Sequence, residues 1–163
     1  MSLFQDTGAH FSDCRKYRYV LWRIWDDSKS AIQFIGLNPS TASEQQDDPT
    51  IRRVIRFAKD WGYGGIYMTN LFAIVSSDPG ILLTCEDPVG RNDDYLLEVA
   101  RICKYDALFA WGNFKQAEQR AIVVSNMFAK PKVLGFNKNG SPKHPLYVPA
   151  NVIPVPFHTQ SQQ

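Results

Sequence analysis

Hydrophobic and polar residues alternate along the chain from residue 17 to residue 25. Val20 and Ile24 fall on one face of this segment and Arg23 falls on the other, which is the two-residue period of a β-strand. A short polar turn follows, and then a continuous apolar run at 31–37 that is typical of a buried strand. Two strands joined by a short turn predict an antiparallel hairpin near the N-terminus.

Beyond this hairpin, helical and strand patterns alternate to the end of the chain. Asp48 and Pro49 predict a helix start, because Asp caps helices and Pro suits the first helical position. Asn92 is expected to cap a second helix. The alternation predicts a single α/β domain over 1–163, a three-layer α/β/α sandwich with a mainly parallel central sheet and loosely ordered ends at 1–16 and 157–163. The other expected elements are a helix at 115–129 and strands at 66–71, 106–111, 132–134 and 147–148.

Composition is that of a globular protein with a sizeable core: 163 residues, 44% hydrophobic and 21% charged. The net charge of +2 is smaller than the basic excess of most nucleic-acid-binding proteins, although it leaves room for a local patch. The three cysteines, at 14, 85 and 103, form no Cys-x-x-Cys pair and are expected to be reduced thiols. There is no apolar stretch of membrane-spanning length and no secretory pattern at the start. We therefore expect a cytoplasmic protein with no membrane partner.

Polar side chains follow several of the predicted strands. Asn38, Asn70 and Asn113 each stand just after a strand, and His144 lies in a loop after another. Because parallel strands present their carboxyl ends at one edge of a sheet, these groups are expected to converge there on a ligand pocket. The alternative is that Asn only shapes turns at these positions, which is also common.

Other candidate chemistry is weaker. Ser40 is a nucleophile only with an activating base, and no Gly-x-Ser-x-Gly elbow is present. Arg52 and Arg53, near the start of the first helix, are either solvated or placed to meet a phosphate. Glycine-rich phosphate loops are missing, and no His pair has metal-ligand spacing, so neither a cofactor nor a metal is expected.

An ordered series of motifs between about Tyr19 and Pro149 resembles a bacterial and phage family catalogued as domain of unknown function 1643. The resemblance covers nearly the whole chain and is specific, but the family name carries no activity. The motifs are Leu37-Asn38-Pro39-Ser40-Thr41-Ala42, Asp48-Pro49-Thr50-x-Arg52-Arg53, Trp61-Gly62-Tyr63, Thr69-Asn70-Leu71-Phe72, Asp87-Pro88-Val89-Gly90-x-Asn92-Asp93, Ala110-Trp111-Gly112 and His144-Pro145-Leu146-Tyr147.

A more distant resemblance concerns chemistry. Gly36-Leu37-Asn38-Pro39 is similar to the first motif of the mismatch-specific uracil-DNA glycosylases, and His144-Pro145 is similar to the start of their second motif. This resemblance implies a uracil-DNA-glycosylase-like fold in which Asn38 positions the attacking water, Asn70 reads the base edge and His144 contacts the base carbonyl. Leu146-Tyr147 departs from the family's Ser-Pro, and the loop that enters DNA is not recognisable.

Three functions are compatible with these residues. The first is an enzyme that hydrolyses a nucleobase N-glycosidic bond, with Asn38 and His144 as catalytic residues. The second is a non-catalytic module that binds a nucleobase, nucleotide or DNA, and the third is a structural or interaction domain. The candidate substrate-binding residues are Asn70, Ser40, Phe72, Trp111, Arg52 and Arg53.

Overall fold

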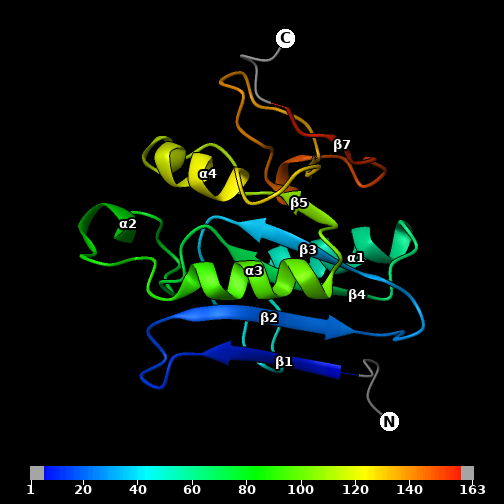
Figure 1. The fold of residues 1–163 in the computed structure, drawn as a ribbon, viewed down its shortest axis with the longest axis horizontal. Helices are drawn as coiled ribbons and strands as arrows, with labels where there is room; N and C mark the ends of the chain where they lie inside the picture. The colour runs from blue at the N-terminus through cyan, green and yellow to red at the C-terminus, as the bar shows by residue number, and fades with distance from the viewer. Residues whose placement is uncertain (1–5, 159–163) are drawn as a thin grey trace.

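The computed structural model describes residues 6–158, which form a seven-stranded sheet flanked by helices (Figure 1). The strands lie in the order β1-β2-β4-β3-β5-β6-β7. The elements are β1 (Asp6–Phe11), β2 (Arg18–Ile24), β3 (Ala31–Gly36), α1 (Pro49–Asp60), β4 (Gly65–Asn70), α2 (Ile81–Thr84), α3 (Asn92–Ile102), β5 (Ala107–Phe109), α4 (Glu118–Ser125), β6 (Lys132–Val133) and β7 (Val155–Pro156), with 3₁₀ turns at Lys115–Ala117 and Pro145–Tyr147.

The centre of the sheet is parallel, as the sequence predicts. Strands β4, β3, β5 and β6 run in one direction, whereas β2 pairs antiparallel with β4, β1 with β2, and β7 with β6. Residues of β3 are in register with both neighbours, so that Phe34 lies opposite Met68 of β4 and Leu108 of β5. The carboxyl ends of β3, β4 and β5 therefore meet at one edge.

The predicted hairpin between residues 17–25 and 31–37 is wrong, because β4 lies between β2 and β3. Ile32, Phe34 and Ile35 are fully buried, and β3 takes parallel neighbours along both of its edges. The hairpin of this domain is instead β1–β2. The expectation of a loosely ordered segment at 1–16 is therefore wrong at Asp6–Phe11; residues 1–5 and 159–163 lie outside the described part of the chain.

Helices cover both faces of the sheet and make three layers. In Figure 1, α3 crosses in front of the sheet while α1 lies behind it. The core on the α1 side joins Ile32 and Phe34 of β3 to the apolar stripe of that helix. The core on the other side joins Ile35 to α3 and α4 through Leu96 and Val124. Alternate residues of β3 therefore supply two separate cores.

Helix α1 follows the prediction closely. The Asp48 carboxylate accepts a hydrogen bond from the Ile51 N–H at 2.9 Å, and Pro49 occupies the first turn. One face of the helix is apolar and buried. The buried residues are Ile51, Val54, Ile55, Phe57 and Ala58.

Three other local predictions need correction. Asn92 does not cap α3; it is fully buried, and its Nδ2 donates to the carbonyl oxygens of Asn70 and Leu71 at 2.7 and 3.2 Å. The helix expected over 115–129 is shorter and begins as a 3₁₀ turn. Residues 147–148 form no edge strand, because His144 and Pro145 start a 3₁₀ turn there. The strand that pairs with β6 at this edge is β7.

Candidate functional site

A cavity of about 250 Å³ opens at the carboxyl ends of β3 and β4. This is the place where open parallel sheets bind ligands. Its walls come from seven parts of the chain: the start of β2, the turn after β3, the start of α1, the end of β4, the loop between β4 and α2, the segment after β5, and His144 before the second 3₁₀ turn. The lining residues that carry polar or aromatic chemistry are Arg18, Asn38, Ser40, Asp48, Thr50, Asn70, Ser76, Ser77, Trp111 and His144.

The side-chain nitrogen of Asn38 has a structural role. Its Nδ2 donates to the carbonyl oxygens of Pro39, Ile74 and Ser76 at 3.1, 3.3 and 3.0 Å. Because carbonyl oxygens only accept, these contacts establish which end of the amide is nitrogen. Within residues 6–158 these three bonds use the Nδ2 alone, and Asn38 lines the cavity, so its Oδ1 can accept a hydrogen bond from a water molecule or a ligand N–H.

Asn70, at the end of β4, lies against Gly36 across the parallel pair. The residue is only 3% exposed, and its Nδ2 is buried without a hydrogen-bond partner in residues 6–158. A Cβ on Gly36 would come within 2.7 Å of the Asn70 Oδ1, so glycine at this position leaves the amide room to lie where it does. An unpaired buried amide is costly, and a ligand at this wall would satisfy it.

His144 presents a neutral imidazole. Its Nδ1 accepts a hydrogen bond from the Leu146 N–H at 3.1 Å, so the ring proton of the neutral form sits on Nε2 as a donor. Burial lowers the pKa of His144, and the nearby Asp48 carboxylate opposes this shift only in part. Protonation would also break the Leu146 contact, because Nδ1 would then carry a hydrogen. At neutral pH His144 can therefore donate a hydrogen bond to a carbonyl oxygen.

Ser40 and the long loop after β4 complete the rim. The Ser40 Oγ lies 3.4 Å from the Ser77 Oγ, and Ser76 and Ser77 both line the cavity. The Asn38 amide draws this loop toward the turn after β3 by its bond to the Ser76 carbonyl. The 72–90 loop thus contributes wall residues that sequence patterns did not single out.

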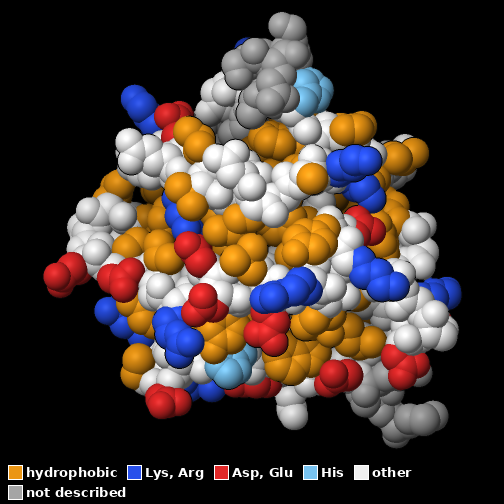
Figure 2. All heavy atoms as spheres, viewed as in Figure 1, with side chains coloured by type: hydrophobic (Ala, Val, Ile, Leu, Met, Phe, Trp, Pro, Cys, Tyr) orange, Lys and Arg blue, Asp and Glu red, His pale blue; other side chains and the backbone are white. Residues whose placement is uncertain are grey.

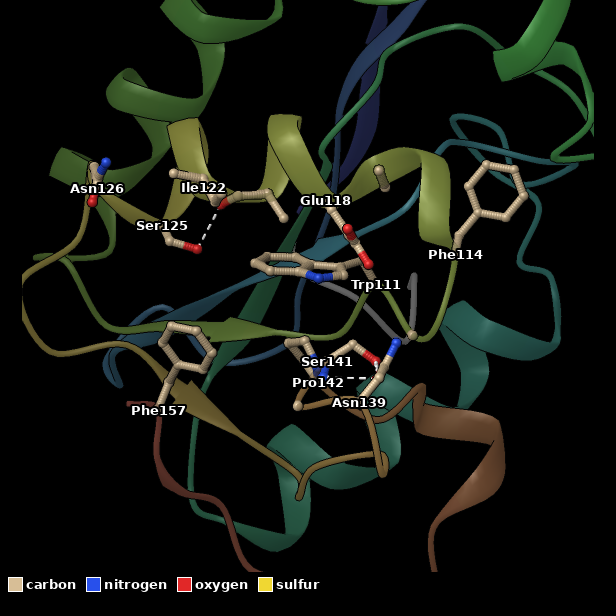
Figure 3. A pocket seen from close by; sticks show the side chains of 14 residues that line it. Trp111, Phe114, Glu118, Ile122, Ser125, Asn126, Asn139, Ser141, Pro142 and Phe157 are labelled. Carbon is tan, nitrogen blue, oxygen red and sulfur yellow. Dashed lines mark hydrogen bonds between the residues drawn. The ribbon is translucent and has the colours of Figure 1, made fainter. Parts of the chain in front are cut away.

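Trp111 separates this cavity from a second one of about 340 Å³, and lines both. Figure 3 shows the second cavity, in which the Trp111 indole lies between Ile122 of α4 and Ser141 of the loop before the 3₁₀ turn. Its walls are mostly apolar, with Phe157 at one side and Glu118 as its only titratable side chain. The smaller cavity differs in bringing Arg18, Asp48 and His144 together at the carboxyl ends of the strands.

Four residues expected at the site lie elsewhere. Phe72 is buried in the core on the α3 side. Arg52 is exposed and donates to the Asp47 carbonyl oxygen, and Arg53 donates to the Val148 carbonyl oxygen, so neither lines the cavity. Asn113 is exposed and accepts a bond from Asn139 at 2.7 Å. The structure brings together Asn38, Ser40, Asn70, Trp111 and His144 and leaves these four outside.

Sequence reasoning missed two charged residues of the cavity wall, Arg18 and Asp48. Asp48 was recognised only as a helix cap, but it also lines the cavity. Arg18 is 3% exposed, and burial lowers its pKa to about 10, so it remains charged at neutral pH. A signal that could have found Arg18 is its place beside apolar residues in the strand predicted over 17–25.

Two features are absent from residues 6–158. No group of three or more His, Cys, Asp or Glu side chains within this range is placed to hold a metal ion. In the same range, every helix is too short or too polar to traverse a bilayer.

Comparison with known proteins identifies a family without assigning an activity. No curated protein and no solved structure matches the chain. A family model described as "Protein of unknown function (DUF1643)" matches residues 18–146, which include β2 and every polar cavity residue up to His144. The chain therefore belongs to the DUF1643 family.

Proposed function

We propose that the cavity binds a nucleobase joined to a sugar and hydrolyses the N-glycosidic bond between them. The observation that carries the proposal is that Asn38, Asn70 and His144, far apart in the sequence, line one cavity at the sheet edge. Together they offer an acceptor, an unpaired amide and a neutral imidazole donor. That set matches the polar edge of a planar base and the water that would attack the sugar.

Each residue has a defined part in the proposed reaction. The Asn38 Oδ1 accepts a hydrogen bond from a water molecule and aims it at the sugar carbon. As the water oxygen bonds to that carbon, the carbon–nitrogen bond breaks and its electron pair leaves with the base. The His144 Nε2–H donates to a base carbonyl and stabilises the developing anion, which is worth several kcal/mol in a site that excludes water.

Proton balance requires an acceptor for the proton that the water loses. Asp48 lines the same cavity, and only its Oδ1 is used by the helix cap. Its carboxylate can take the proton, which finally resides on the released base. The Asn70 amide reads the base edge, and Trp111 provides an aromatic wall on which a planar ring can lie.

More specifically, we propose that the cavity residues are arranged as in a uracil-DNA glycosylase. The support for this arrangement is the placement of Asn38 after β3, Asn70 at the end of β4 and His144 before a proline, which agrees with that resemblance. Duplex DNA is less well supported as the substrate. On the face shown in Figure 2, Lys and Arg side chains are interspersed with Asp and Glu, with no continuous basic surface on which a duplex would lie.

The test is base release. Oligonucleotides containing uracil and other modified bases, free nucleosides and nucleotides would be incubated with the protein at high concentration, and the bases separated by chromatography. We expect release by the wild type and loss of at least about 100-fold in rate on His144→Asn, since general acid–base and donor groups contribute about that much. Asn can also accept the Leu146 N–H, so this variant keeps the cap.

Asp48→Asn is the second variant, because Asn caps a helix about as well as Asp and the fold is retained. Asn113→Ala is the matched control, since Asn113 is exposed and outside the cavity. Absence of base release by the wild type across the whole panel would remove the catalytic proposal.

A non-catalytic base-binding module is the second candidate. The Asn38 amide favours this candidate. Its three hydrogen bonds to backbone carbonyl oxygens explain why an asparagine stands at this position without any role in catalysis. This function predicts that a nucleobase or nucleotide raises the melting temperature of the wild type without turnover. His144→Asn and Asn70→Ala would reduce the shift, and Asn113→Ala would not. The lack of any shift would exclude this candidate as well.

A further inference from the structure

Strand β2 carries two buried arginines, which differ in their hydrogen-bond partners. Arg18 is 3% exposed and Arg23 is 1% exposed. All three guanidinium nitrogens of Arg23 have protein partners: Nε donates to the Asp47 carboxylate at 2.9 Å, and Nη1 and Nη2 donate to backbone carbonyl oxygens. These carbonyls belong to Gly8, Trp22, Ser43 and Gln46. Arg23 is thus a structural arginine with its charge and donors satisfied.

Arg18 has almost none of these partners. Its Nη1 donates to the Ala42 carbonyl oxygen at 3.1 Å, and its Nε is buried with no acceptor. No carboxylate of residues 6–158 forms an ion pair with it. Leaving charged donors buried and unpaired is costly, and a ligand with acceptor oxygens would relieve this cost at Arg18. The difference between the two is that Arg18 lines the cavity.

We propose that Arg18 binds the phosphate group of a nucleotide whose base occupies the Asn38–Asn70–His144 end of the cavity. A guanidinium presents parallel N–H groups that match the oxygens of a phosphate. The base-directed groups and the buried cation line one cavity, so a single ligand that carries both a base and a phosphate can contact both. This proposal rests on the proposed function, and it names the substrate class as a nucleotide rather than a nucleoside or free base.

The other charged group facing the cavity is Asp48. Its Oδ1 accepts from the Ile51 N–H at the start of α1, where the helix dipole also favours negative charge. Its carboxylate is therefore already stabilised by the helix and forms no ion pair with Arg18 in the described chain. The Asp48 charge acts on Arg18 and opposes in part the lowering of its pKa by burial, but no carboxylate of residues 6–158 forms an ion pair with the Arg18 guanidinium.

Binding measurements with and without the phosphate test the proposal. Calorimetric titrations would use inorganic phosphate, the 5′-monophosphates of deoxyuridine and of the four common deoxynucleosides, deoxyuridine itself, and a uracil-containing single-stranded oligonucleotide. We expect a monophosphate to bind the wild type and Arg18→Met to weaken that binding about 10–100-fold, the contribution of charge-assisted hydrogen bonds. Binding of deoxyuridine should be unchanged. Arg18→Lys keeps the charge without the fork and should retain part of the affinity.

Arg23→Met is the matched control for folding. We expect it to lower the melting temperature, because it leaves Asp47 and several carbonyls unpaired, whereas Arg18→Met should leave the melting temperature unchanged or raise it. If the oligonucleotide binds and the free monophosphates do not, the phosphate that Arg18 recognises belongs to a strand.

The outcomes separate this inference from the proposed function. Phosphate binding that Arg18→Met abolishes, without any base release or nucleoside binding, would sustain the Arg18 site and sink the proposed function. Equal affinity of wild type and Arg18→Met for every phosphate-bearing probe, or no binding of any of them to the wild type, overturns the Arg18 proposal. Severe destabilisation by both Arg18→Met and Arg18→Lys, together with unaltered phosphate binding by whatever remains folded, also overturns it.

Discussion

Replacing Asn38 by Asp exchanges one NH₂ group for an oxygen and changes nothing else in shape. In the wild type this NH₂ lies 3.0–3.3 Å from three backbone carbonyl oxygens. It has two hydrogens, so it supplies the equivalent of two full hydrogen bonds. Their loss costs roughly 1–3 kcal/mol in the free energy of unfolding, at about 0.5–1.5 kcal/mol each. Repulsion between the new carboxylate and the carbonyl oxygens adds to this loss.

The repulsion gives the Asn38→Asp variant a characteristic pH dependence. Carbonyl oxygens around the carboxylate raise its pKa in the folded state above the unfolded value of about 3.9. A group with a raised folded pKa contributes its full stability below the unfolded pKa and loses it as the pH rises through the folded pKa. The deficit of the variant relative to wild type should therefore be larger at pH 7.5 than at pH 4.5.

Urea denaturation of wild type and variant at several pH values measures this deficit. Asn113→Asp is the control, because Asn113 is exposed and uses its Oδ1 as an acceptor, which Asp keeps. We expect the control to lie within about 0.5 kcal/mol of wild type. A variant at position 38 as stable as wild type at pH 7.5, or a deficit independent of pH, would refute the assignment of the Asn38 amide as a clamp on the loop after β4.

Three further predictions address the cavity and its support. Gly36→Ala should reduce ligand binding far more than stability. The new Cβ would meet the ends of the Asn70 and Met68 side chains, at 2.7 and 2.8 Å, and these ends can move. We therefore expect a loss of about 1 kcal/mol in the free energy of unfolding, measured by urea denaturation, and loss of the ligand-induced rise in melting temperature. The His144 ring should titrate below its ordinary pKa when followed by NMR, and ligand binding should be constant above that midpoint and fall as the pH drops through it; a midpoint above 6.5 would contradict the neutral donor. Asn92→Ala should cost about 1–3 kcal/mol, because it removes two buried bonds to backbone carbonyls, and a change below 0.5 kcal/mol in denaturation would count against that role.

Local signals in the sequence were sufficient where the physics is local. The cap at Asp48 and the proline after it depend on neighbours within one turn, and α1 begins where they predict. Alternation also identified β2, and the unbroken apolar run identified β3 as buried on both faces. The α/β class and the parallel centre of the sheet follow from the order of such segments.

Strand pairing was not decided by local signals. A strand bonds to whichever partner buries its edge best, and the turn between β2 and β3 does not reveal that β4 will come between them after the α1 crossover. The same reasoning applies to Asn92. Asparagine is a common helix cap, but the side chain of Asn92 instead donates hydrogen bonds to the carbonyl oxygens of Asn70 and Leu71. Such choices depend on contacts between segments distant in the sequence.

The chemistry of the site divides in the same way. From the sequence alone, Asn38, Asn70 and His144 could be recognised as polar groups at strand ends and in a loop after a strand, because parallel strands place such ends together. Only the tertiary structure could separate Arg18 from Arg23, two arginines of one strand. Whether a buried charge is paired depends on which distant oxygens surround it, and the fold surrounds one with acceptors and leaves the other facing a cavity.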